Sequence, residues 1–337
     1  MRASPGECLC GCASPPSTWR TWTTVPDTGP SLEARIAALR PALLRLDADV
    51  LCLQEVNAQG RKHHDRQFDA LDAVLADTPY AGYTKRATTE SASGHGGCVW
   101  SPWGASRSWR GGSFGTIWSR RLATVRRRSI PGLAEALDLD RPILLTSFDG
   151  SDGVPLHILN LHLRAPRPHP IPGQRDGRDW RSAEGWAEGL FIASVLRAGQ
   201  ALETRRLVDS LFAAEAEPRI VVCGDFNASD NELSLRIVMG PQEEDEAGSG
   251  LHRSLLHALE RTVPAETRYS VLHAGRPMML DHVLVSGTLG RAHRGSWIDN
   301  AGLSDEVTAA DRKTFGGSFH APVAVEFDLA ALADRGA

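Results

Sequence analysis

The chain has 337 residues, which is enough for one large α/β domain or two small ones. Acidic residues slightly outnumber basic ones, 41 against 37, and the formal net charge of −4 argues against a surface built for non-specific binding of nucleic acid. No apolar run is long enough to span a bilayer and the N-terminus has no apolar signal segment, so we expect a cytoplasmic protein without a membrane span.

Residues 1–30 have neither helical nor strand periodicity, and we expect them to form an irregular arm. Cys8, Cys10 and Cys12 alternate within this arm, but no second half of a zinc site follows at a suitable spacing. Cys52 and Cys223 lie inside apolar runs and are expected to be core residues.

Helices and strands are indicated from Ser31 onwards. Ser31 is expected to cap a helix that reaches Leu46, with Pro41 bending or restarting it. Further helices are expected over residues 65–76 and 182–214. Apolar runs predict strands at 49–56, 142–148, 154–163, 220–227, 269–272, 280–285 and 322–327. We interpret residues 31–330 as a single domain.

The segment from residue 95 to 130 departs from this pattern. Four of the nine tryptophans lie there among Gly, Ser and Arg, and such a segment could bind nucleic acid or a membrane surface. The composition is also what a GC-rich gene yields when it is read out of frame. We favour that second hypothesis for residues 1–30 and about 95–120, and an error-free gene sequence with one continuous frame would contradict it.

Polar residues stand at the ends of five predicted strands. Burying an ionisable group without a partner is costly, so five such strand ends in one chain predict that these side chains meet at a common site. The set comprises Gln54, Glu55, Asn160, His162, Asp225, Asn227, Asp281, His282 and His320.

Together these motifs resemble the endonuclease/exonuclease/phosphatase superfamily, the DNase I, exonuclease III and sphingomyelinase-like enzymes. The resemblance runs from about Ser31 to Leu329. It implies a four-layered α/β sandwich, in which two mainly antiparallel sheets lie face to face with helices outside. It also implies metal-dependent hydrolysis of a phosphate ester (nucleic acid, lipid or small molecule), and we expect a monomer.

The resemblance further implies a role for three of the polar residues. Glu55 would be the principal ligand of Mg²⁺ or Mn²⁺, ions that prefer oxygen ligands. Asp225 would position or deprotonate the attacking water, and Asn227 would hold a phosphate oxygen.

Two imidazoles complete the expected site. Asp281 would orient His320, fix its tautomer and raise its pKa. His162 would be a second imidazole near the scissile bond, and Asn160, on the same strand face, would support the binding of substrate. His282 is expected to be structural or to support a neighbour.

The sequence departs from the family in two places. Members usually begin with a strand that ends in an asparagine of the metal and phosphate site, yet the first asparagine here is Asn57. The residue before His320 is Phe319, where the family usually has an acid. Two alternatives follow: a catalytically impaired member that acts as a binding module, and the product of a damaged reading frame.

Overall fold

The computed structural model describes residues 30–56, 68–87, 141–148, 150, 152–242, 250–309 and 315–333. For four further strands it describes the backbone alone, namely β1 (Glu7–Ala13), β4 (Gly96–Trp100), β5 (Leu122–Arg126) and β6 (Ala134–Leu137). Most of the segment interpreted as frame-shifted therefore lies outside the described residues.

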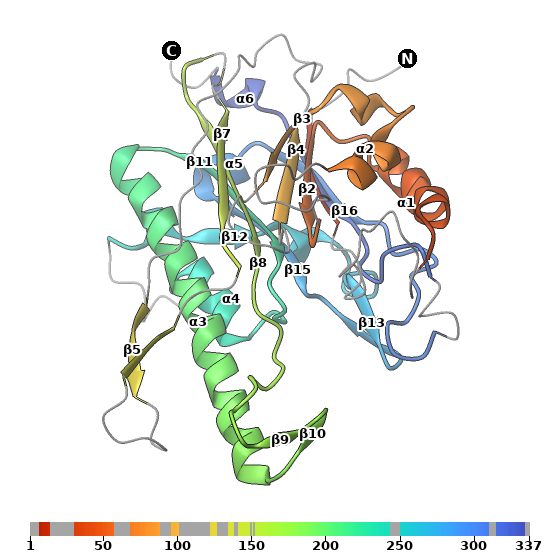
Figure 1. Cartoon of the computed structure of the whole chain (residues 1–337). Helices are drawn as coiled ribbons and strands as arrows, with labels where there is room; N and C mark the ends of the chain where they lie inside the picture. Colours follow the sequence, from red (N-terminus) through yellow and green to blue (C-terminus); the bar gives the residue numbers. More distant parts are fainter. Residues whose placement is uncertain are drawn as a thin grey trace.

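Two sheets lie face to face at the centre of the molecule (Figure 1). One has the strand order β16-β17-β1-β2-β4-β3, and the other has the order β12-β15-β11-β8-β7. Within them β1–β2 and β8–β11 are parallel pairs, whereas the other neighbours are antiparallel. The remaining bounds are β2 (Val50–Gln54), β3 (Thr84–Ala87), β7 (Leu144–Phe148), β8 (Leu156–His162), β11 (Arg219–Asp225), β12 (Leu256–Ala258), β15 (Asp281–Ser286), β16 (His293–Ile298) and β17 (Val323–Phe327).

Helices cover the outer faces of both sheets. The helices α1 (Leu32–Leu46) and α2 (Asp69–Leu75) pack on the six-stranded sheet, whereas α3 (Ala183–Ala214) and α4 (Leu233–Met239) pack on the five-stranded one. Ser31 caps α1 as predicted, because its Oγ accepts the backbone N–H of Ala34. The four-layered α/β sandwich is confirmed.

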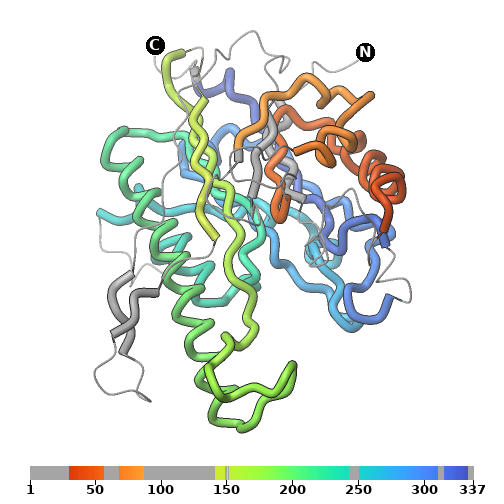
Figure 2. The backbone as a smooth tube through the Cα atoms, viewed as in Figure 1, coloured from red at the N-terminus to blue at the C-terminus, as the bar shows by residue number. Residues whose placement is uncertain are grey.

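Smaller elements connect these layers or project from them. The hairpin β9–β10 lies at the end of α3 that extends away from the sheets (Figure 2). No helix among the described residues is long and apolar enough to cross a membrane. The short elements are β9 (Arg175–Asp176), β10 (Asp179–Trp180), β13 (Val271–His273), β14 (Arg276–Met278), α5 (Gly287–Gly290), α6 (Ala330–Ala333) and 3₁₀ turns at Pro79–Gly82, His252–Ser254 and Leu259–Thr262.

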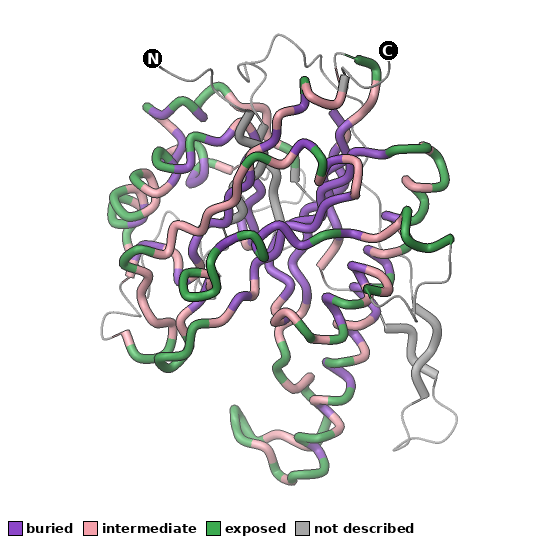
Figure 3. The backbone as a smooth tube through the Cα atoms, turned by 180° about the vertical axis from the view of Figure 1, so that it is seen from behind, coloured by how far each residue is buried: buried purple, intermediate pink, exposed green. Residues whose placement is uncertain are grey.

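The central strands are apolar on both faces because one face meets the other sheet and the opposite face meets helices. Successive side chains of a strand point to opposite faces, so in β11 Val221 and Cys223 enter the core between the sheets, whereas Ile220 and Val222 pack under the helices. Buried residues accordingly gather along the central strands, and exposed ones lie on the helices and loops (Figure 3). The long apolar runs thus correctly predicted buried strands.

The prediction of an irregular arm over residues 1–30 is wrong for residues 7–13. They form β1, which is paired with β17 on one side and with β2 on the other. The sequence signal was weak because the run Cys8-Leu9-Cys10 has no β-branched residue, so this strand is determined by its two neighbours rather than by local propensity. The helix α1 also continues through Pro41, where a bend or restart was expected.

Candidate active site

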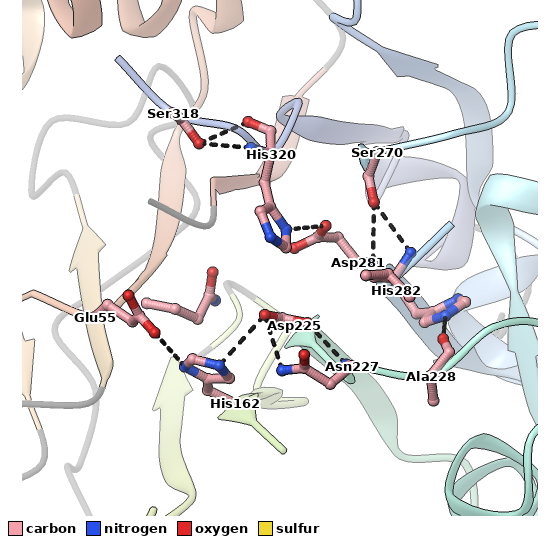
Figure 4. Close-up of polar contacts among 12 residues, drawn as sticks. Glu55, His162, Asp225, Asn227, Ala228, Ser270, Asp281, His282, Ser318 and His320 are labelled. Atoms are coloured by element: carbon pink, nitrogen blue, oxygen red, sulfur yellow. Dashed lines mark hydrogen bonds and ion pairs between the residues drawn. The ribbon is translucent and has the colours of Figure 1, made fainter. Parts of the chain in front are cut away.

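The strand periodicity also places the polar side chains. Residues 160 and 162 of β8, 225 of β11 and 281 of β15 have the same parity as the residues of the inter-sheet core, so they emerge at one end of that layer. Asp225 is the register partner of His162 on one side and of Asp281 on the other. His320 reaches the same place from the segment before β17 (Figure 4).

One hydrogen bond and two longer ion-pair contacts connect residues of this cluster. His320 Nδ1 lies 2.7 Å from Asp281 Oδ2, and Asp281 is fully buried. His162 Nε2 lies 3.3 Å from Asp225 Oδ2, and its Nδ1 lies 3.9 Å from Glu55 Oε1. The structure therefore brings together the carboxylates and imidazoles that the sequence singled out, except that His282 points to the other face of the sheet.

The turn after β11 fixes the Asp225 carboxylate. The backbone N–H of Asn227 donates to Asp225 Oδ1 at 2.7 Å, and its side-chain Nδ2 donates to Oδ2 at 3.1 Å and to the Leu163 carbonyl at 3.0 Å. Asn227 has a φ of 47°, a left-handed conformation that asparagine tolerates better than most residues. To hold a phosphate oxygen, as predicted, Asn227 would have to exchange one of these bonds for a bond to substrate.

Glu55 leaves its strand in a left-handed conformation as well, with a φ of 54°. Such backbone conformations cost roughly 1 kcal/mol or more and cluster at functional sites. The preceding Gln54 donates from Nε2 to Asn160 Oδ1 at 2.6 Å, and Asn160 Nδ2 donates to the Leu53 carbonyl at 3.1 Å. Asn160 is thus buried and joins the two sheets beside the site, and direct contact between Asn160 and substrate stays a prediction.

Burial and neighbouring charges shift the pKa values of two groups in the cluster. Burial raises the pKa of Asp225 to about 7; the His320 charge opposes the rise and the Asp281 carboxylate adds to it. Burial alone would lower the pKa of His320, but the Asp281 carboxylate and its hydrogen bond raise it to about 10. Near neutral pH the site therefore holds an imidazolium at His320 beside an Asp225 that can gain or lose a proton.

Acidic and histidine groups that could hold a metal ion are present. One ligand atom from each of Asp225, Asp281 and His320 lies within 4.8 Å of the others. However, His320 Nδ1 is bonded to Asp281, and the raised pKa favours a protonated ring, so a cation would have to compete with a proton for this imidazole. The chemistry of this trio favours a hydrogen-bonded pair over a metal site.

Sequence reasoning missed two supporting residues. Arg141 donates from Nη1 to the Leu163 carbonyl at 3.0 Å, and its charge lowers the pKa of Asp225. Ser270 Oγ accepts the backbone N–H groups of Leu280 at 3.1 Å and Asp281 at 3.2 Å. Neither residue lies in a strand-end motif, so their supporting roles can be recognised only from contacts in the folded protein.

The position of Phe319 agrees with the second departure seen in the sequence. Its side chain is buried and its ring lies 4.9 Å from that of Phe315, so the position supplies packing in place of an acid.

Comparison with known proteins places this arrangement of strands and polar residues in a family. A model described as the Endonuclease/Exonuclease/phosphatase family matches residues 17–305. The chain belongs to this family. Membership in the endonuclease/exonuclease/phosphatase family supports phosphoester hydrolysis as the class of reaction, and enzymes of the family generally use divalent metals.

Solved structures share the fold of this family member at low sequence identity. Truncated TDP2 from Caenorhabditis elegans is 12% identical with a TM-score of 0.53, over 94% of this chain and 96% of that one. D. rerio TDP2 complexed with single strand DNA product is 13% identical with a TM-score of 0.53, over 95% and 98%. A family protein from Bacteroides thetaiotaomicron is 15% identical with a TM-score of 0.52, over 89% of each chain. No curated protein sequence matches the chain.

Proposed function

We propose that the protein is a metal-dependent phosphodiesterase that works through Asp225 and the Asp281–His320 pair. The observation that supports this most is the convergence, at one end of the inter-sheet layer, of a cationic imidazole and a carboxylate whose pKa is about 7. Phosphoester hydrolysis requires a base for water and a cation for the phosphate oxygens, and this pair of groups offers both.

Glu55 is the residue that we propose as the principal ligand of Mg²⁺ or Mn²⁺. Its carboxylate supplies the oxygen that these ions prefer, and its side chain is 22% exposed, whereas that of Asp281 is inaccessible. A bound ion would neutralise charge that develops on the phosphate oxygens.

Three side chains of the protein would carry out proton transfer and the binding of the phosphate and the ester oxygen. The Asp225 carboxylate accepts a proton from the water that attacks phosphorus, the ester P–O bond breaks as the water oxygen bonds, and the leaving alkoxide takes up a proton from solvent water. His320, held by Asp281, donates from its other ring nitrogen to a non-bridging phosphate oxygen. His162 lies between Glu55 and Asp225, where it can hydrogen-bond the scissile ester.

A pocket of about 440 Å³ is lined by segments that adjoin Asp225–Asn227 and Asp281 in the sequence, and we propose that it receives the organic part of the ester. It is formed by residues 229–232, which follow the Asp225–Asn227 turn, and 277–279, which precede Asp281, together with Ala265 and Arg268. Methionine side chains beside an arginine suit a flat, partly polar group such as a nucleobase. The related D. rerio TDP2 was solved with single strand DNA product, so short single strands are the first substrates to test.

The proposed function is tested by hydrolysis of bis-p-nitrophenyl phosphate, p-nitrophenyl phosphate and a short single-stranded DNA, with Mn²⁺, Mg²⁺ or EDTA. We expect metal-dependent turnover that falls by roughly 100-fold or more in Glu55→Gln and His320→Gln. Glu217→Gln is the matched control, because Glu217 is 69% exposed and pairs with Arg291 at the surface. Turnover that persists unchanged in EDTA, or in Glu55→Gln, would contradict the proposal.

A catalytically impaired binding protein is the second candidate, favoured by the buried Phe319 and by a β1 that contains no asparagine. Such a protein would bind single-stranded DNA or phosphate esters without turning them over. Calorimetry with Mn²⁺ separates the two, since we expect the enzyme to bind the ion and Glu55→Gln to bind it at least tenfold more weakly.

A further inference from the structure

A second charged pair is buried directly behind the site. His282 and Glu260 are both fully buried, and His282 Nδ1 lies 2.6 Å from Glu260 Oε1. The other oxygen of Glu260 accepts the backbone N–H of Val283 at 3.2 Å. His282 follows Asp281 in β15 and therefore points to the opposite face of the sheet, away from the cluster (Figure 4).

The partners of His282 determine its protonation. Nε2 lies 2.7 Å from the carbonyl oxygen of Ala228, which can only accept, so Nε2 carries a hydrogen. Burial would lower the pKa of this ring, but the Glu260 carboxylate raises it above its usual value, which favours a proton on Nδ1 as well.

The same contacts argue against a metal site at this place. One potential ligand atom from each of Asp230, Glu260 and His282 lies within 4.8 Å of the others. Nε2 of His282 is engaged by the Ala228 carbonyl and Nδ1 by the Glu260 carboxylate, however, so both ring nitrogens already have protein partners. The pair must be explained by its protein contacts.

Those contacts tie the turn after β11 to β15. The N–H of Phe226 donates to the Leu280 carbonyl at 2.9 Å, and the Ala228 carbonyl accepts from His282, so two hydrogen bonds flank Asn227. Arg197 holds the carbonyl of Asn227 itself. A residue in a left-handed conformation needs such constraints, because its backbone is strained without them.

We propose that His282, with Glu260, is a positioning residue that fixes the Asp225–Asn227 turn relative to Asp281 through the Ala228 carbonyl. This inference rests on the proposed function, since the geometry it protects is that of the proposed base. A buried ion pair is seldom more stable than an apolar pair of the same size, so its place between two parts of the site favours a role in alignment. A displacement of about 1 Å at a reacting centre can cost about 100-fold in rate.

Three variants separate alignment from stability. In Glu260→Gln the amide nitrogen can donate to Nδ1 of a neutral His282 while the amide oxygen accepts from Val283, so the bond to Ala228 survives. In that background His282→Gln places an amide N–H near the position of Nε2 and can still reach Ala228. His282→Asn reaches only the Nδ1 position, toward residue 260, and loses Ala228.

We expect Glu260→Gln to keep kcat within about threefold of wild type, and Glu260→Gln/His282→Gln within about tenfold. Glu260→Gln/His282→Asn should lose about 100-fold in kcat with KM changed less than about threefold, at a melting temperature close to that of the other double variant. Equal losses of kcat in both double variants, or no loss in either, would overturn the proposal.

Amide hydrogen exchange measures the same tether without turnover. Exchange at Phe226 and Asn227 should accelerate in Glu260→Gln/His282→Asn but not in Glu260→Gln/His282→Gln. If wild type is inactive but the two double variants differ in exchange as expected, the proposed function is contradicted and the tether stands. If wild type is active but the two double variants exchange alike, the tether alone is overturned. If neither double variant folds, the test rests on Glu260→Gln. A folded Glu260→Gln variant that loses about 100-fold in kcat overturns the proposal, and one that keeps its kcat supports it.

Discussion

Replacing Asp281 by asparagine should lower the pKa of His320 from about 10 to its ordinary value of 6.5 or below. The asparagine side chain keeps the size of the aspartate and can still accept a hydrogen bond from Nδ1, but it removes the charge that holds the proton. Burial, which disfavours the imidazolium, is then opposed by the charges of Asp225 and Glu306.

The expected effect is large. A difference of about 3.5 units corresponds to roughly 5 kcal/mol in favour of the charged ring. At pH 8 about 99% of the wild-type rings would be charged, against about 3% at a pKa of 6.5. Loss of the cation that stabilises phosphate charge should lower kcat by about 100-fold to 1,000-fold at that pH.

The same shift changes the dependence of stability on pH. Because the pKa of His320 is raised on folding, its contribution to the free energy of unfolding is complete below pH 6.5 and is lost as pH rises toward 10. The pKa of Asp225 is raised from 3.8 to about 7 on folding, so its contribution to stability is lost as pH rises from about 4 to 7. That loss is almost complete before about pH 7.5. Between pH 7.5 and 9.5 wild type should therefore lose more stability than Asp281→Asn.

Three measurements test this reasoning. Titration of the His320 ring by NMR in metal-free protein should give the two pKa values, urea unfolding at pH 7.5 and 9.5 should give the difference in slope, and the rate profile should lose its alkaline limb near pH 10. Asp328→Asn is a suitable control, because Asp328 pairs with Arg294 at the surface. A His320 ring that still titrates near pH 10 in folded Asp281→Asn would refute the argument.

Two further predictions concern the support of the site. Gly224→Ala should lower the free energy of unfolding by about 3 kcal/mol or more, because its φ is 134° and a Cβ would lie 1.9 Å from the Leu161 carbonyl oxygen. Gly275→Ala, at a φ of 77° in open space, should cost about 1 kcal/mol in the same denaturant titration, and equal losses would contradict the explanation by close approach. Arg141→Gln should raise the pKa of Asp225 and move the acid limb of kcat/KM to higher pH, with up to about threefold less activity at pH 6.5 for a rise of half a unit. An unmoved acid limb would show that Arg141 does not act on this carboxylate.

Much of the candidate site could be predicted because parity along a strand does not depend on the rest of the fold. Asn160 and His162 share a face in any strand that contains them, and the apolar residues at 158 and 156 show that this face is buried. The same argument applies to Asp225 after Val221 and Cys223. What the sequence could not specify is the register that makes Asp225 the neighbour of both His162 and Asp281.

Contacts between segments far apart in the chain could not be predicted from the sequence either, because they too depend on how the strands are paired. Glu260 lies in a 3₁₀ turn without a strand or helix period, and nothing in its sequence indicates a partner at His282. The strand β16 was missed because its residues are only partly buried and lack an apolar alternation. Arg141 precedes its strand, and only the approach of Leu163 discloses its role.

The position of β1 also bears on how the chain can acquire activity during synthesis. Its antiparallel partner is β17, and Glu7 is paired with Phe327, so β1 cannot complete its pairing until the ribosome has made β17. His320 emerges just before β17, which means that the imidazolium and the strand that closes the six-stranded sheet become available together. A nascent or C-terminally truncated chain would therefore lack both, and the proposed hydrolysis would begin only when the sheet is complete.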